Sequence, residues 1–240
     1  MAYVELKGNI FNTKAQAVVN TVNCIGAMGK GIALEFKLRF PEMFIEYQEI
    51  CEKRLLRPGQ IWPYRKGKPW VLNFAIKDDW HQPSKVEWVE NTLKKFSSSY
   101  KQLGISSIAF PWMGAMNGGI PFETIQDLTR KYLSNLTDIN IEVYEFDPNV
   151  TDPLFEKLVY IINQPKIDYI YLFKKSDIQA HTWKKIYEVM KNEKIISLYK
   201  LMKYEIDDKT LIGKTNIEKL YYFLNKYEPS KHKPIELTLF

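Results

Sequence analysis

A strand, a glycine-rich loop and a helix follow one another within residues 17–37, and this succession constrains the fold more than any other part of the chain. The short apolar run 17–19 leads into NTVNCIGAMGKGIALEFK, residues 20–37, which contains three glycines before its helical pattern. A strand that enters a helix through such a loop directs backbone N–H groups and the positive end of the helix dipole toward one cavity. The segment therefore predicts an anion site, best suited to phosphate.

The spacing of the three glycines excludes two common nucleotide motifs. They do not form the dinucleotide-binding fingerprint, and Gly29-Lys30-Gly31 lacks the ending of a P-loop. A tight turn that uses glycine only for its backbone is the simple alternative. Asn20 and Asn23 favour a ligand site instead, because two carboxamides at the end of a strand can bind the hydroxyls of a sugar. We therefore expect a ligand that carries both ribose and phosphate.

Residues 1–147 alternate between strand and helix patterns. Strands are predicted at 3–6, 17–20, 60–64, 70–75, 107–110 and 141–146, and helices at 31–40, 41–52, 84–103 and 121–136. Ser84 followed by Glu87 predicts a capping box at the start of the longest helix. The alternation predicts an α/β fold, a mixed central sheet sandwiched between helices, with ligand loops at the carboxyl ends of strands.

Residues 20–37 resemble the signature of the macrodomain, an ADP-ribose-binding α/β fold, and in particular its DarG branch, which is related to the human terminal ADP-ribose glycohydrolase. The resemblance covers residues 1–147. Gly8-Asn9-Ile10 matches the place where the family carries Gly-Asp-Ile or Gly-Asp-Leu, whose acid accepts a hydrogen bond from the adenine amino group. An amide oxygen accepts the same bond without the charge. The resemblance implies that Asn9 orients adenine and that Ile10, beside it, belongs to the ligand-binding residues.

The segment VLNFAIKDDW contains the second match. Lys77 stands where the hydrolytic branch of the family carries its catalytic lysine, in a segment that usually reads Asn-Phe-Pro-Thr-Lys. A lysine at the mouth of a site lined by Phe74, Trp80 and Trp112 would be partly desolvated, which lowers its pKa and increases the neutral, nucleophilic fraction. Such an amine could attack the anomeric carbon of the distal ribose. A solvated lysine in an Asp-rich loop is the alternative.

The segment IAFPWMGAMNGGI is the third match, a predicted strand that runs into a second glycine-rich loop. Its glycines allow the backbone to approach a diphosphate and to supply N–H donors. Where this branch usually reads Gly-Cys-Gly-Asn-Gly-Gly, the loop has Ala115 and Met116. The human glycohydrolase has a catalytic aspartate in this loop, but residues 114–121 contain no acid here. Asp78 and Asp79, beside the candidate lysine, are substitutes suggested by proximity in the sequence.

Composition limits the alternatives. The chain has 240 residues, enough for one α/β domain and a small second one, and 45% of them are hydrophobic. No apolar run approaches the ~20 residues of a membrane span, and the strand-like start predicts no leader peptide. Cys24 and Cys51 are too few for a disulfide framework or a cysteine zinc site, so we expect a cytoplasmic protein without a metal. Of three distant histidines, His81, His181 and His232, the first could contact substrate but is more typical of a surface histidine.

The turn-rich run DPNVTDP separates residues 1–147 from a second predicted domain, residues 152–240. Lys and Arg outnumber Asp and Glu by 18 to 16 before position 151 and by 16 to 12 from position 152, so the tail holds four of the six net positive charges. Helices are predicted at 153–163, 176–190 and 216–227, and a strand at 169–173. The second domain should therefore be small, basic and mainly helical.

Basic residues interleaved with aromatic ones in this tail allow two interpretations. A surface for single-stranded nucleic acid would stack bases on aromatic rings and bind phosphates with lysines. However, Tyr221, Phe223 and Tyr227 recur at helical spacing, which favours a buried core. DarG proteins resemble this layout in carrying a C-terminal region that binds and blocks the DarT toxin, which would make a DarT-like toxin the partner of residues 152–240.

The resemblance implies a hydrolase that removes ADP-ribose from DNA bases, with single-stranded DNA as the expected form, and that acts as the antitoxin to a DNA ADP-ribosyltransferase. Lys77 would be catalytic, no cofactor would be needed, and ADP-ribose would be ligand and product. The ligand-binding residues would be Asn9, Ile10, Asn20, Asn23, Gly26, Met28, Gly29, Lys30, Gly31, Gly114, Ala115, Met116, Asn117, Gly118 and Gly119. A non-catalytic ADP-ribose reader and a hydrolase of ADP-ribosylated protein side chains are the alternatives.

Overall fold

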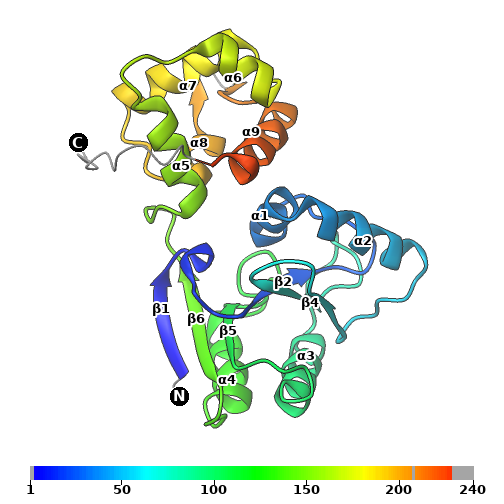
Figure 1. The fold of residues 1–240 in the computed structure, drawn as a ribbon. Coiled ribbons are helices and arrows are strands. Elements are labelled where there is room, and N and C mark those ends of the chain that lie inside the picture. Colours follow the sequence, from blue (N-terminus) through cyan, green and yellow to red (C-terminus); the bar gives the residue numbers. More distant parts are fainter. Residues whose placement is uncertain (1–2, 207–208, 229–240) are drawn as a thin grey trace. The chain divides into compact units, whose positions relative to one another are not determined.

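Six strands form one mixed sheet in the computed structural model, which describes residues 3–206 and 209–228 (Figure 1). The strands are β1 (Tyr3–Gly8), β2 (Ala17–Val22), β3 (Ile61–Tyr64), β4 (Trp70–Ala75), β5 (Ser107–Pro111) and β6 (Asn140–Phe146). Their order is β1-β6-β5-β2-β4-β3, and neighbours are parallel except for β3, which runs antiparallel to β4. The predicted α/β class and all six predicted strands of residues 1–147 are confirmed.

Helices cover both faces of this sheet (Figure 1). The helices are α1 (Gly31–Arg39), α2 (Pro41–Glu52), α3 (Val86–Ser99) and α4 (Phe122–Leu133), with a short 3-10 turn η1 (Ile10–Asn12) after β1. Val18 lies in the core beneath α1 and α2 with Met43, whereas the next residue, Val19, lies in the core beneath α3 and α4 with Leu93. Because successive side chains of a strand point to opposite faces, β2 buries its residues on both sides.

The parallel strands place their following loops along one edge of the sheet. β5, β2 and β4 are neighbours, so the loops 112–121, 23–30 and 76–85 that follow them lie next to one another. In open α/β sheets, ligands bind outside the carboxyl ends of the strands. These loops contain the three motifs identified in the sequence, two of them rich in glycine and one with Lys77. The sequence predicted that all three would lie at one edge of the sheet.

The predicted capping box at Ser84 is wrong. Helix α3 begins at Val86, and its N-cap residue, Lys85, makes no side-chain capping bond. The backbone N–H of Ser84 donates instead to the carbonyl of Gly118 at 2.9 Å. This contact with a loop distant in the sequence ties Ser84 to the ligand edge of the sheet, two residues before the helix begins.

Contacts divide the chain into two compact units, Met1–Asp147 and Pro148–Phe240. The described part of the second unit contains α5 (Pro153–Ile162), α6 (Tyr169–Ser176), α7 (Ala180–Asn192), α8 (Leu198–Lys203) and α9 (Lys214–Lys226), with the two-residue strands β7 (Glu205–Ile206) and β8 (Lys209–Thr210). Its core contains Trp183, whose ring packs edge-on against Phe223 and whose Nε1–H donates to the hydroxyl of Ser176 at 2.9 Å. Tyr221 is also fully buried. The core interpretation of these aromatic residues is therefore confirmed, whereas Tyr227 is only half-buried.

One prediction for the second unit is wrong. Residues 169–173, predicted as a strand, belong to α6, because the Asp168 carboxylate accepts bonds from the N–H groups of Ile170 and Tyr171 and so caps a helix. The three predicted helices are confirmed as α5, α7 and α9 with ends shifted by up to four residues, and α8 and the short strands were not predicted.

Candidate functional site

Three hydrogen bonds join the loops that follow β2, β4 and β5. The N–H of Cys24 donates to the carbonyl of Asp78 at 3.0 Å, and the ammonium of Lys77 donates to the carbonyl of Asn117 at 2.6 Å. The bond from Ser84 to the Gly118 carbonyl is the third. The predicted motifs therefore meet in one place, and each loop is positioned by another.

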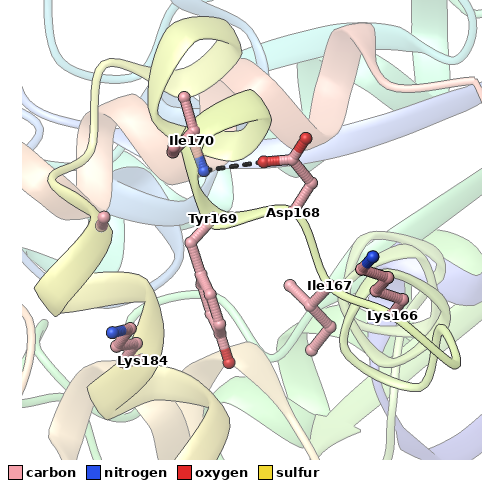
Figure 2. Close-up of a pocket in the computed structure, with 7 residues that line it drawn as sticks. Lys166, Ile167, Asp168, Tyr169, Ile170 and Lys184 are labelled. Atoms are coloured by element: carbon pink, nitrogen blue, oxygen red, sulfur yellow. Dashed lines mark hydrogen bonds between the residues drawn. The ribbon is translucent and has the colours of Figure 1, made fainter.

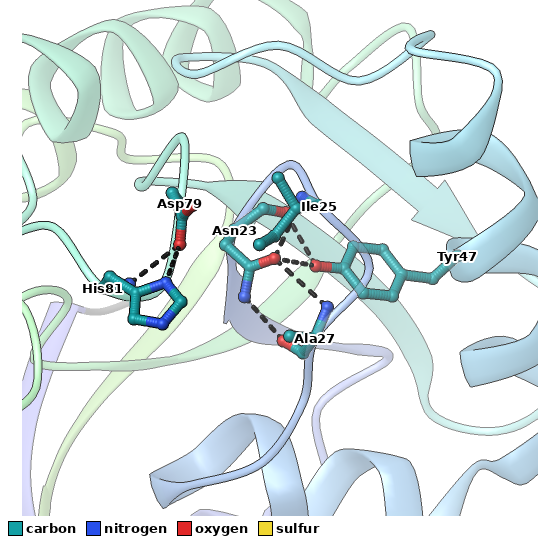
Figure 3. Close-up of polar contacts among 6 residues, drawn as sticks. All are labelled: Asn23, Ile25, Ala27, Tyr47, Asp79 and His81. Atoms are coloured by element: carbon teal, nitrogen blue, oxygen red, sulfur yellow. Dashed lines mark hydrogen bonds and ion pairs between the residues drawn. The ribbon is translucent and has the colours of Figure 1, made fainter.

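The side chain of Asn23 organises the loop after β2 (Figure 3). Its Oδ1 accepts bonds from the N–H groups of Ile25 and Ala27 at 3.1 and 3.2 Å and from the Tyr47 hydroxyl at 3.0 Å, and its Nδ2 donates to the Ala27 carbonyl at 2.6 Å. The same hydroxyl also lies 2.7 Å from the Asn23 carbonyl. The loop is thus fixed around one carboxamide, and the contact of Asn23 with ribose stays a prediction.

Tyr47 is a site residue that the sequence analysis did not identify. It is fully buried on α2, and burial raises the pKa of its phenol far above the ordinary value, so the group stays a hydroxyl donor. In the sequence, Tyr47 looks like any other buried residue of an amphipathic helix, so its position does not indicate a contact with the loop after β2. Only the fold brings it to Asn23, 24 residues earlier in the chain.

Asn20 has no exposed surface, in contrast to what a ligand-binding residue requires. Its Nδ2 donates to Asn73 Oδ1 on β4 at 2.8 Å and lies 3.9 Å from the sulfur of Met28. Its Oδ1 is buried and has no hydrogen-bond partner among the residues that the structure describes. Met28 is itself buried, and Asn20 has no exposed surface, so a ligand would reach this oxygen only if the surrounding residues moved.

Several positions in the two loops require glycine, because a side chain there would be strained by the backbone conformation or would clash with a neighbouring atom. Gly31 has a φ of 59° at the start of α1, and a Cβ there would lie 2.4 Å from Asn117 Nδ2. A Cβ on Gly118 would lie 2.3 Å from the carbonyl oxygen of Gly114, which has a φ of 85°. The loops therefore close tightly on themselves and approach each other at Asn117.

The start of α1 offers backbone donors. Its N-cap residue, Lys30, makes no side-chain capping bond and is exposed. The first N–H groups of a helix have no partner within the helix, and together with the helix dipole they favour an anion. This local geometry suits the predicted phosphate site, to which Lys30 would add positive charge.

Burial lowers the pKa of Lys77 below the ordinary lysine value, in the predicted direction. The expectation that Phe74 lines the mouth of the site is wrong. Phe74 is fully buried in the core, where its ring packs against those of Phe96 and Phe110, so it does not line the mouth of a site. Trp80 is 51% exposed on the loop of Lys77. Trp112 is half-buried, and its ring packs edge-on against that of Phe122.

The carboxylate of Asp79 is not directed to Lys77. It accepts bonds from the backbone N–H of His81 at 2.9 Å and from the ring Nδ1 of His81 at 2.8 Å (Figure 3). Asp78 is exposed and contributes its backbone carbonyl to Cys24. Across residues 3–206 and 209–228, no carboxylate lies within ion-pairing distance of the Lys77 ammonium.

Four further predicted ligand residues lie at two places, after β1 and after β5. Asn9 is buried after β1, and its Oδ1 accepts a bond from the N–H of Phe11 at 3.1 Å, so it caps η1. Ile10 is buried beside it. Met116 is 78% exposed at the tip of the loop after β5, and its neighbour Ala115 is half-buried. Contact of these residues with adenine or diphosphate stays a prediction.

Both cysteines are buried free thiols. Burial raises the pKa of the Cys24 thiol to about 12 and raises that of Cys51 as well. Within the described ranges no group of three or more His, Cys, Asp or Glu side chains could hold a metal ion, and no helix there is long and apolar enough to cross a membrane.

The second unit contains a hollow of about 620 Å³ at the start of α6 (Figure 2). Lys166, Tyr169 and Lys184 line it, and the Lys184 ammonium lies 5.7 Å from the centre of the Tyr169 ring. Asp168 faces it as well, but its carboxylate is used to cap α6. The hollow contains none of the predicted site residues.

Comparison with known proteins finds a matching family model and similar curated proteins. The Macro domain family model matches residues 19–129. A Thermus aquaticus protein named DNA ADP-ribosyl glycohydrolase is 35% identical over 166 residues, which cover 68% of this chain and 45% of the relative. A Thermosipho africanus protein named DNA ADP-ribosyl transferase-DNA ADP-ribosyl glycohydrolase fusion protein is 28% identical over 158 residues, 58% of this chain and 40% of the relative. The chain thus spans less than half the length of these curated relatives.

Two solved structures are similar to the chain. The macrodomain of Thermus aquaticus DarG has a TM-score of 0.57 and 36% sequence identity, and the match covers 60% of this chain and 98% of that one. Thermosipho africanus DarTG in complex with ADP-ribose has a TM-score of 0.54 and 28% identity, covering 58% of this chain and 40% of that one. Nearly the whole length of the solved DarG macrodomain therefore has a counterpart in this chain.

Proposed function

The chain belongs to the macrodomain family, and from this we propose that its first unit is a hydrolase that removes ADP-ribose from DNA bases. One observation carries the proposal: Lys77, with a pKa lowered by burial, lies against the Asn117 carbonyl where two glycine-rich loops meet. A lysine of lowered pKa in a ligand site has a larger fraction of nucleophilic amine. The relatives named DNA ADP-ribosyl glycohydrolase support the choice of reaction.

We propose the following arrangement of ADP-ribose. Asn9 and Ile10 bind the adenine, and the loops 26–31 and 114–119 bind the diphosphate through backbone N–H groups. Asn23 and Asn20 bind the distal ribose, the second through its buried Oδ1, which has no hydrogen-bond partner among the described residues, once a movement of the loop after β2 exposes it. The structure of the related fusion protein in complex with ADP-ribose supports this choice of ligand.

The chemistry assigned to Lys77 is nucleophilic. Its neutral amine attacks the anomeric carbon of the distal ribose, and the modified base leaves. Water then attacks the same carbon and releases ADP-ribose from the lysine. A covalent intermediate of this kind divides one difficult displacement into two easier ones. No step requires a cofactor.

The second unit is proposed to bind a protein partner. A DarT-like toxin is the proposed occupant of residues 152–240, since a relative joins a DNA ADP-ribosyl transferase and a glycohydrolase in one chain. The protein would then act as an antitoxin, both by reversing the modification and by binding the enzyme that makes it. We place it in the cytoplasm, where two buried free thiols remain reduced.

The test uses the full chain and two substrates. A single-stranded oligonucleotide carrying ADP-ribose on a base is compared with a protein carrying ADP-ribose on acidic side chains, and released ADP-ribose is quantified by mass spectrometry. Release from the oligonucleotide supports the proposal. Release from the protein alone would replace it with the protein hydrolase, and binding of ADP-ribose without release from either substrate would identify a reader.

A further inference from the structure

His81 is exposed but held in one orientation. The His81 side chain is 63% exposed, yet its Nδ1 lies 2.8 Å from Asp79 Oδ1. The same carboxylate oxygen accepts a hydrogen bond from the backbone N–H of His81 at 2.9 Å. The indole of Trp80 stacks on the imidazole with ring centres 3.4 Å apart. Two contacts from its two preceding residues, the Asp79 carboxylate and the Trp80 ring, therefore hold an imidazole that an ordinary surface position would leave free to rotate.

This contact determines which ring nitrogen is available. A carboxylate on Nδ1 holds the tautomer with the proton on that nitrogen and directs Nε2 away from the pair. Nε2 makes no hydrogen bond to any residue in the described part of the chain. The pair thus has the composition of a proton-transfer device.

The loop that carries this pair is the loop of the ligand site. Lys77 lies four positions before His81, and the bond from the Cys24 N–H to the Asp78 carbonyl places Asn23 and Asp79 on adjacent, hydrogen-bonded segments (Figure 3). The distal ribose assigned to Asn23 is therefore beside the Asp79–His81 pair. The reaction assigned to Lys77 needs a proton donor for the leaving base, and the loop after β5 contains no acid.

We propose that Asp79 and His81 form the acid–base pair of the glycosidic reaction, with His81 as the catalytic residue and Asp79 as its positioning residue. This inference rests on the function proposed above. The pair begins with His81 as the imidazolium. As the Lys77 amine forms its bond to the anomeric carbon, the electron pair of the carbon–base bond leaves with the base, and His81 Nε2 gives that base its proton and becomes neutral. A water molecule then attacks the anomeric carbon, its proton passes to Nε2, and the carbon–nitrogen electron pair returns to the lysine. The second step restores the imidazolium and the neutral amine.

Chemical rescue by imidazole tests the proposal, because His81 is open to solvent. The kcat for release of ADP-ribose from the modified oligonucleotide is measured for the full chain, for His81→Ala and for Asp79→Asn, with and without added imidazole. We expect His81→Ala to lower kcat by ~100-fold with little change in KM, since positioned acid–base groups contribute 10²–10⁴-fold. Imidazole should restore a saturable part of this loss. Asp79→Asn should lower kcat about 10-fold without rescue.

Controls distinguish a failure of the acid–base pair from a failure of the proposed hydrolase function. His181→Ala, an exposed histidine on α7, should leave kcat unchanged with and without imidazole. Binding of ADP-ribose by His81→Ala, measured by calorimetry, should match the original protein and so exclude misfolding. An unchanged kcat in His81→Ala, or a loss that imidazole does not restore, overturns the acid–base pair alone. Absence of turnover by the unsubstituted protein overturns the hydrolase and the pair together.

Discussion

The side-chain nitrogen of Lys77 lies 2.6 Å from the main-chain oxygen of Asn117, which connects the loop after β4 to the loop after β5. Asn117 in turn has its side-chain amide next to Gly31 at the start of α1. One asparagine therefore lies between the candidate catalytic amine and the helix terminus suited to phosphate. The position of Lys77 depends on the backbone of a glycine loop, so substitutions in that loop should affect the chemistry.

Gly118→Ala should damage the loop after β5. Its Cβ would lie 2.3 Å from the Gly114 oxygen and 2.5 Å from the Gly114 Cα, and backbone atoms cannot yield as a side chain can. We expect the free energy of unfolding to fall by ~1–3 kcal/mol and the affinity for ADP-ribose to fall at least ~10-fold. Denaturant unfolding and calorimetry measure the two quantities.

Gly67→Ala is the matched control, since no atom lies within 4 Å of the added Cβ. It should change the free energy of unfolding by less than ~0.5 kcal/mol and leave affinity unchanged. If Gly118→Ala behaved like Gly67→Ala, the tight closure of the loop would be refuted.

Tyr47→Phe should loosen the loop that Asn23 organises. The substitution removes a buried hydroxyl that contacts both the carbonyl and the side-chain oxygen of Asn23. A lost buried hydrogen bond costs about 1–2 kcal/mol of stability, and a freer carboxamide should weaken ADP-ribose binding several-fold. Tyr132→Phe, which loses a half-buried bond to Glu90 on the other face of the sheet, should leave the affinity unchanged. Equal affinities for the two variants would contradict the role of Tyr47.

The thiol of Cys24 should be inert although it lies in the ligand loop. Its pKa is raised to about 12, and that of Cys51 is also raised, so at pH 8 both remain protonated thiols, whereas alkylation requires the thiolate. Iodoacetamide at pH 8 should add no mass to the folded protein and two groups after unfolding in guanidinium chloride. Rapid single labelling of the folded protein, seen in its intact mass, would show that Cys24 is accessible.

Lys77 should make stability depend on pH. Its folded-state pKa is lowered by burial, so between that pKa and the ordinary value of about 10.4 the folded state binds fewer protons than the unfolded chain. The cost of burying the charge is thus fully present below the lowered pKa and declines as pH rises through this window. The unfolding free energy of the original protein, minus that of Lys77→Met, should increase from pH 7 to pH 10 in urea titrations. A constant difference would mean that Lys77 titrates as a solvated lysine.

The sequence was sufficient for features that depend on local pattern. The strands β2 and β4 and the helices α1 and α2 could be predicted because their apolar residues recur at strand or helix periods next to glycine or proline. The three motif loops then follow from the ends of neighbouring parallel strands. The identity of the proposed ligand, ADP-ribose, came from the resemblance of residues 20–37 to macrodomains.

Features that depend on distant contacts could not be predicted. Ser84 has the composition of a helix cap, but its backbone bond to Gly118 places it in the loop. The run 169–173 has β-branched and aromatic residues, yet the Asp168 cap starts a helix there. Tyr47 reaches Asn23 only through the packing of α2 on the sheet. In each case tertiary structure overrides or adds to a local preference.

The most direct test of the account compares the original protein with Lys77→Ala and Lys77→Arg on a single-stranded oligonucleotide carrying ADP-ribose. Arginine keeps the positive charge but cannot supply a neutral amine. We expect a loss of turnover of at least ~100-fold in both variants, with ADP-ribose still bound, if the Lys77 amine is the nucleophile. Turnover by Lys77→Arg at the rate of the original protein would contradict it, because charge alone would then suffice.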